Sequence, residues 1–164
     1  MSGDGDHRIV ELKLDREMIR WNPDVQREID VAIFDLKEAN RFRPLKPLIP
    51  AATGPYHAHL AIRERQLLID LFMEVDLARP VDQITLATSP FRRVIREYFA
   101  ICESYYAAIK DASPAQIEAI DMGRRGLHND GSETLRERLA EKVEMDFDTA
   151  RRMFTLLCAL HLKA

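Results

Sequence analysis

Hydrophobic and polar positions alternate along four segments of the chain, the pattern of half-buried β-strands. These segments are residues 7–14, 56–63, 67–76 and 83–87. The polar run Arg-Glu-Arg-Gln at 63–66 indicates a hairpin between the second and third segments, although it lacks the glycine of the favoured turns. Arg79-Pro80 predicts a break before the fourth, because proline cannot donate to a central strand. We therefore expect a four-stranded, mostly antiparallel sheet.

Apolar positions three and four residues apart predict helices elsewhere. One early helix is expected from Asn22-Pro23 to about residue 41, because asparagine and proline favour a helix start. The C-terminal part predicts a group of about four helices, over residues 91–109, 114–128, 133–142 and 147–161. Together with the sheet they predict an α+β fold with helices on the apolar sheet face.

Capping residues define the expected helix boundaries. Ser89-Pro90 and Ser113-Pro114 both have a helix-start pattern, and Gln116 completes a capping box with Ser113. Asn129-Asp130-Gly131 predicts a helix end, with Gly131 in the left-handed conformation and Ser132 capping the next helix. Asp146 or Asp148 is expected to cap the last helix.

The length of 164 residues predicts a single domain over 1–164. Residues 1–6 are acidic and polar and are expected to be disordered. Residues 42–55 hold four prolines, which predicts a loop; packing over the core is favoured over a functional role. Ile9, Leu68 and Phe72 are candidates for the sheet face away from the helices, and an apolar open face of this kind is compatible with a homodimer.

Charge and hydropathy narrow the functional classes. The chain has 24 basic and 27 acidic side chains, a net charge of −3, which makes nucleic acid an unlikely partner. No long apolar run and no secretory signal are visible, so we expect a cytoplasmic protein without a membrane partner. Cys102 and Cys158 lie in apolar helical patterns and are expected to be buried free thiols.

The segment Met122–Gly131 is richest in candidate chemistry. Arg124, Arg125, His128, Asn129 and Asp130 surround the predicted helix–helix junction, where a helix N-terminus would favour an anion. A structural alternative is that the arginines pair with Asp121 and Glu118, and that Gly123 lets two helices approach closely.

Arginine outnumbers lysine 18 to 6 and forms three adjacent pairs, Arg92-Arg93, Arg124-Arg125 and Arg151-Arg152. Arg92 and Arg93 fall in the first turn of a predicted helix, where the dipole disfavours a cation unless an acidic group compensates. A solvated, salt-bridged face is the alternative interpretation. If folding brings the pairs together, the surface would suit an acidic partner.

Motifs of known chemistry are missing. The sequence has no phosphate-binding loop, no Gly-x-Ser-x-Gly and no His-Glu-x-x-His, so no catalytic residue is identified and binding is favoured over catalysis. His57 and His59 share one strand face, but nothing nominates a third metal ligand. We therefore expect no metal and no cofactor.

Four strings nevertheless have a familiar character: Thr88-Ser-Pro-Phe-Arg-Arg93, Ile101-Cys-Glu-Ser-Tyr-Tyr106, the segment 117–129 and Asp146-Phe-Asp-Thr-Ala-Arg-Arg152. They resemble an uncharacterised bacterial protein family of unknown function, over nearly the whole chain. The resemblance implies a bacterial cytoplasmic protein. It brings no activity, substrate or catalytic residue with it.

Two hypotheses from different classes follow. The first is a non-catalytic interaction or regulatory protein that binds a cytoplasmic protein through its arginine-bearing helices and modulates that partner's assembly. The second is a protein or enzyme that binds a small phosphate-like anion at the 123–131 junction, where Arg124 and Arg125 hold the anion and His128 or Asp130 moves a proton. The first is preferred on the sequence alone.

Overall fold

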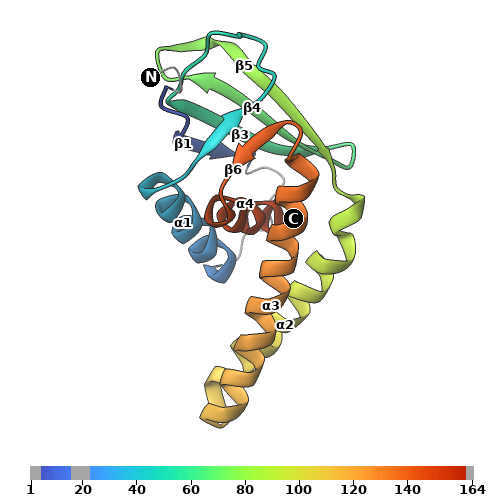
Figure 1. Cartoon of the computed structure of the whole chain (residues 1–164). Coiled ribbons are helices and arrows are strands. Elements are labelled where there is room, and N and C mark those ends of the chain that lie inside the picture. Colours follow the sequence, from blue (N-terminus) through green and yellow to red (C-terminus); the bar gives the residue numbers. More distant parts are fainter. Residues whose placement is uncertain (1–4, 16–22, 162–164) are drawn as a thin grey trace.

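A four-stranded mixed sheet forms one layer of the molecule (Figure 1). The computed structural model describes residues 5–15 and 23–161. The strand order is β1 (Ile9–Leu14), β3 (Tyr56–Arg63), β4 (Gln66–Met73) and β5 (Asp76–Ala87). β1 is parallel to β3, and the other neighbours are antiparallel, which confirms the mostly antiparallel sheet.

The hairpin between β3 and β4 turns without glycine. Glu64 and Arg65 have φ angles of 52° and 63°, the left-handed conformation that a two-residue turn between antiparallel strands requires. The predicted break at Arg79-Pro80 is wrong. β5 runs through both residues, because the register shifts where Phe72 faces Pro80, and an irregular edge strand tolerates a proline.

β1 departs from strict alternation. The register with β3 shifts between Ile9 and Glu11, so Ile9 is fully buried together with Leu12 and Leu14. A bulge of this kind turns neighbouring side chains to the same face. The expectation that Ile9 lies on the open sheet face is therefore wrong, whereas Leu68 and Phe72 are partly exposed.

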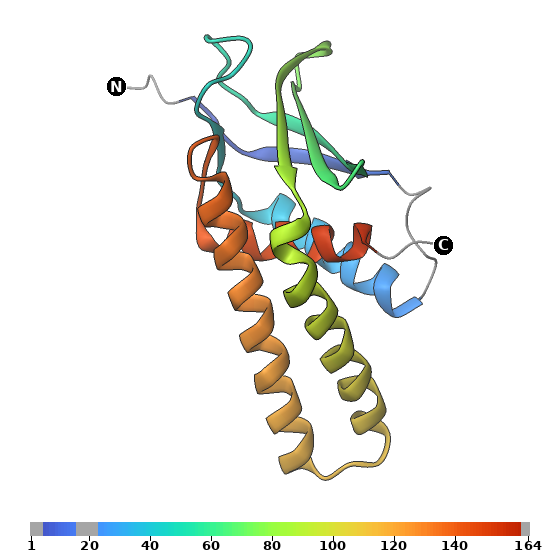
Figure 2. The same cartoon turned by 90° about the vertical axis from the view of Figure 1, so that its right-hand side faces the viewer.

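Helices cover one face of the sheet. Figure 2 shows α1 (Pro23–Glu38) and α4 (Phe147–Leu160) beneath it, while α2 (Arg92–Asp111) and α3 (Pro114–Leu139) form a hairpin that extends away. Nine residues of α4 are buried, more than in any other helix of the described chain, because α4 lies beneath the sheet and packs against both α1 and α3. The α+β class is confirmed.

α3 is one continuous helix of 26 residues, so two of the predicted helices are a single helix. The predicted end at Asn129-Asp130-Gly131 is wrong, and so is the cap at Ser132. Gly131 has no positive φ; a Cβ atom there would overlap the ring of Phe154 on α4. The glycine serves close packing between two helices rather than a helix end, and the junction expected at 123–131 does not exist.

The other capping expectations have mixed outcomes. Ser113 and Gln116 form the predicted capping box, and Asp146 caps α4 by accepting from the backbone N–H of Thr149. Ser89 is not a side-chain cap, since residues 89–91 form a short 3₁₀ turn (η3, Ser89–Phe91) that leads into α2. Asn22, the expected cap of α1, lies outside the described residues.

The proline-rich segment 42–55 is not a loop throughout, contrary to the prediction, because its first three residues form a short strand that pairs with a distant part of the chain. β2 (Phe42–Pro44) pairs with β6 (Val143–Met145), and the backbone N–H of Leu48 donates to the Val81 carbonyl at 2.7 Å. The disorder expected for residues 1–6 does not extend to Asp6, whose N–H donates to the Thr53 carbonyl at 2.6 Å. Residues 1–4 lie outside the described part of the chain. Among the described residues, no helix is both long and apolar enough to cross a membrane.

Candidate functional site

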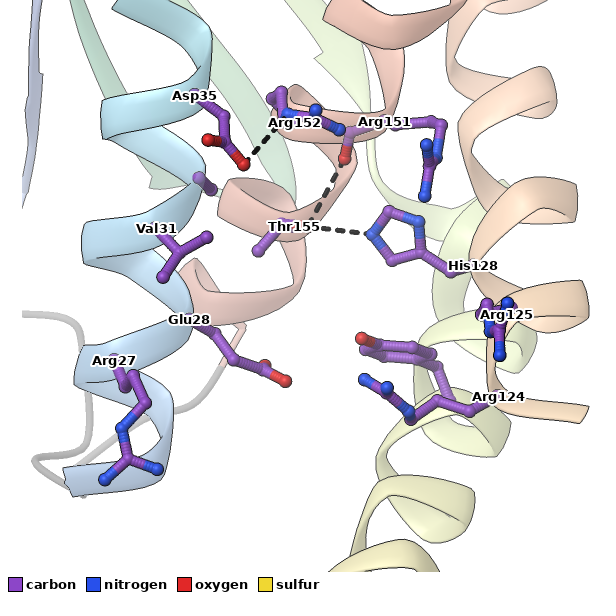
Figure 3. Close-up of a pocket in the computed structure, with 12 residues that line it drawn as sticks. Arg27, Glu28, Val31, Asp35, Arg124, Arg125, His128, Arg151, Arg152 and Thr155 are labelled. Carbon is purple, nitrogen blue, oxygen red and sulfur yellow. Dashed lines mark hydrogen bonds and ion pairs between the residues drawn. The ribbon is translucent and has the colours of Figure 1, made fainter. Parts of the chain in front are cut away.

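A cleft of about 370 Å³ lies between α1 on one side and α3 and α4 on the other (Figure 3). Its lining combines five arginines with two carboxylates, one histidine, one threonine, one tyrosine and two aliphatic residues. The lining residues are Arg27, Glu28, Val31, Ala32, Asp35, Tyr98, Arg124, Arg125, His128, Arg151, Arg152 and Thr155. A cleft with this excess of guanidinium groups is suited to an anion.

One carboxylate holds Arg124 and Arg125 in place. Asp121 lies one turn before them on α3 and accepts from Arg124 Nη2 at 2.6 Å and from Arg125 Nε at 2.9 Å. These two hydrogen bonds lower the pKa of Asp121 below its ordinary value. Arg124 also lies over the ring of Tyr105, 4.5 Å from the ring centroid. The predicted pairing with Asp121 is thereby confirmed.

Arg151 and Arg152 of α4 are much less engaged. Arg151 Nη1 is 3.7 Å from Asp148, and Arg152 Nε is 3.6 Å from Asp35 of α1, both beyond hydrogen-bond length. Arg151 Nε is buried, and no hydrogen-bond acceptor for it exists in the described part of the chain. Buried donors without an acceptor cost free energy. This arginine pair therefore has donors available to a ligand.

His128 lies at the back of the cleft between α2 and α4. Its Nε2 shares a hydrogen bond of 2.8 Å with Thr155 Oγ1, and its ring packs against Tyr98 and Phe154. Burial, and then the positive charges of Arg151, Arg124 and Arg152, lower the pKa of His128 to about 4. The imidazole is consequently neutral at physiological pH.

Glu28 supplies negative charge on the opposite wall. Its Oε1 accepts from the Tyr106 hydroxyl at 3.0 Å. Burial raises the pKa of Glu28, although the Tyr106 hydrogen bond and the charge of Arg124 oppose the shift. Figure 3 shows Glu28 and Arg124 pointing toward each other across the cleft.

The structure brings only part of the predicted residue set together. Arg124, Arg125 and His128 line the cleft, where the Arg151-Arg152 pair joins them. Asn129 and Asp130 are exposed on α3 and do not line it. The three arginine pairs therefore do not form one surface.

The third pair lies elsewhere. Arg92 lines a separate cavity of about 600 Å³ beside the β3–β4 turn, with Arg63 and Arg65. Arg93 is exposed and lies 3.4 Å from Glu97 on its own helix. Neither residue is among those that line the cleft.

Sequence reasoning missed the α1 wall and Thr155. The signal was present as helical spacing, since Glu28, Val31 and Asp35 recur every three or four residues, as do Arg151 and Thr155. Such spacing identifies a helix face. It does not say which other helix that face meets, so the opposing wall could not be assigned.

The remaining candidates are structural or isolated. His57 lies 3.5 Å from Glu74, and His59 packs against Phe72, both on the sheet face away from the helices. Within residues 5–15 and 23–161, no group of three histidine, cysteine or acidic side chains could hold a metal ion. Cys102 and Cys158 are buried free thiols, as predicted.

Comparison with known proteins identifies the family. A model of an uncharacterised protein family (UPF0262) matches residues 6–163. A UPF0262 protein of Azorhizobium caulinodans is 53% identical over 158 residues, covering 96% of this chain and 95% of the relative. Relatives from Erythrobacter litoralis and Brucella canis are 49% and 52% identical and cover 96% and 94% of the chain, and 98% and 93% of their own lengths. No solved structure matches the chain. The resemblance to an uncharacterised bacterial family is confirmed, and the chain belongs to UPF0262.

Proposed function

We propose that this protein binds a small anionic molecule, carrying a phosphate or carboxylate group, in the cleft between α1, α3 and α4. The observation that carries the proposal is the convergence of Arg124-Arg125 and Arg151-Arg152, which are far apart in sequence, on one cleft. Its volume of about 370 Å³ falls within the range of roughly 300–1,000 Å³ that is usual for small-molecule sites.

The arginines on the α4 side favour binding because their donors are not used up within the fold. Arg151 Nε is buried without an acceptor in the described residues, and Arg152 has only a long contact with Asp35. A guanidinium group presents paired N–H donors that match a phosphate or carboxylate. An anion placed between Arg151 and Arg152 would supply the missing acceptors.

The chemistry of the cleft matches ligand binding better than catalysis by proton transfer. A general base works best when its pKa is near the operating pH, and the pKa of His128 is about 4. The neutral imidazole, hydrogen-bonded to Thr155, is suited to shaping the cleft and to hydrogen bonding with a ligand. This chemistry suits a protein that carries the small molecule or is regulated by it.

A protein partner with an acidic surface is the second candidate. It is favoured by Arg92, which lies outside the cleft at the start of α2 and has no ion pair among the described residues, whereas Arg93 pairs with Glu97. Modulation of that partner's assembly remains part of this candidate. The concave site around Arg151 suits a small anion better than a protein surface, so the acidic protein partner is the second choice.

The test is isothermal titration calorimetry with inorganic phosphate at constant ionic strength. The variants Arg151→Gln and Arg152→Gln remove one guanidinium group each, and Arg93→Gln is the matched control outside the cleft. We expect each cleft variant to weaken phosphate binding by at least about tenfold, equivalent to roughly 1.4 kcal/mol, and the control to bind like the parent.

Equal phosphate affinity in the parent and both cleft variants would contradict the proposal. A loss in Arg93→Gln with no loss in Arg151→Gln would move the binding surface to the start of α2 and favour the acidic protein partner. Circular dichroism of each variant establishes that the fold is intact.

A further inference from the structure

The two walls of the cleft differ in charge. The α3 and α4 wall carries four arginines and no carboxylate, whereas α1 contributes both lining carboxylates, Glu28 and Asp35, together with Arg27 at its outer end (Figure 3). Opposite charges in one small site normally pair with each other at hydrogen-bond distance. Here they do so incompletely, which is informative about the ligand.

Glu28 has one partner for its carboxylate. Tyr106 donates to Oε1 at 3.0 Å, while no donor to Oε2 is present among the described residues. The guanidinium group of Arg124, which points toward Glu28, is bound to Asp121 instead. The second carboxylate oxygen therefore remains available on the cleft side of α1.

Asp35 shows the same incomplete pairing. Its Oδ2 lies 3.6 Å from Arg152 Nε, too far for a hydrogen bond. Asp35 of α1 and Arg152 of α4 thus face each other at the cleft without forming a hydrogen bond. Each wall keeps capacity for one more partner.

A simple anion would satisfy only the arginine wall. It would also bring a negative charge into the same cleft as Glu28 and Asp35, and like charges in a partly buried site repel each other. A molecule with an ammonium group beside its anionic group would satisfy both walls.

We propose that the ligand is amphoteric, with a phosphate or carboxylate bound by Arg151 and Arg152 and an ammonium group bound by the carboxylate of Glu28. This inference rests on the proposed function and specifies the class of its ligand. Small amino acids and amino-alkyl phosphates belong to this class.

Phosphoethanolamine and ethyl phosphate test the proposal, because they share the phosphate ester and differ by the ammonium group. Calorimetric titration of the parent protein should give tighter binding of phosphoethanolamine by about tenfold, the effect of one added charge-assisted contact. Glu28→Gln should abolish this preference while retaining the binding of ethyl phosphate. In Glu28→Gln the side-chain amide oxygen still accepts from the Tyr106 hydroxyl. Glu38→Gln, at the exposed end of α1, is the control.

Equal affinity of the two compounds in the parent would overturn the amphoteric ligand and leave the anion site intact. A preference that survives in Glu28→Gln would also overturn it, because the carboxylate of Glu28 would then have no part in recognition. Failure of both compounds and of inorganic phosphate to bind would reject the anion site itself.

Discussion

Gly131 of α3 packs directly against the ring of Phe154 of α4, with no room for a Cβ atom between them. Phe154 is fully buried and cannot move aside. Gly131→Ala should therefore lower the free energy of unfolding by about 1–3 kcal/mol, because overpacking outweighs the better helix propensity of alanine.

Gly126, on the same helix, is the matched control. Nothing lies within 4 Å of a Cβ atom at this position, so Gly126→Ala should raise the free energy of unfolding by about 0.5–1 kcal/mol. Urea unfolding of both variants measures the contrast. If Gly131→Ala were as stable as Gly126→Ala, the close contact of α3 with α4 would be wrong.

Asn40 joins the end of α1 to the edge strand β1. Its Oδ1 accepts from Ile9 N–H at 2.8 Å, and its Nδ2 donates to the carbonyls of Ile9 and Leu36 at 2.8 and 2.7 Å. Asn40→Ala should reduce the free energy of unfolding by roughly 2–4 kcal/mol, about one kcal/mol for each lost hydrogen bond. Asn129→Ala, on the exposed surface of α3, should change it by less than about 0.5 kcal/mol, and similar losses in both would contradict the role of Asn40.

The titration of His128 should make the folded state less stable in acid. Its pKa is about 4 in the fold and 6.5 in an ordinary environment, so between these values the unfolded chain binds a proton that the folded chain does not. The free energy of unfolding therefore falls as the pH drops from about 6.5 to about 4. His128→Gln should flatten this part of the stability profile, measured by urea unfolding across that pH range.

Two-dimensional NMR tests the titration of His128 directly. The His128 ring signals should keep the neutral form well below pH 6.5. Protonation of His128 near its ordinary value would show that burial and the arginines do not act on it as the geometry requires.

The two cysteines should be unreactive in the folded protein. Burial raises the pKa of Cys102 to about 11 and that of Cys158 well above its ordinary value, so little thiolate is present near neutral pH. A disulfide reagent should label them only after unfolding in urea. Ser104→Cys, at an exposed position of α2, should react at once and serves as the control; rapid labelling of the parent would contradict the buried positions.

The strands and most helix starts follow from local sequence. Alternation over 56–63 sets the buried face of β3, and Ser113 with Gln116, as well as Asp146, cap helices where expected. Such features depend on residues that are neighbours along the chain, so their physical cause is contained in a short window.

The continuity of α3 and the composition of the cleft depend on contacts between distant segments. Asn129-Asp130-Gly131 has the local signature of a helix end, yet the packing of Gly131 on Phe154 rewards an uninterrupted helix at that point. Arg124 and His128 could be nominated from sequence, but Glu28 and Arg151 meet them only because α4 packs against both α1 and α3. The sequence by itself determined the fold class, the helix faces and the charge of each face. Only the tertiary structure decided which faces meet, because helix packing is governed by long-range burial that no local pattern records.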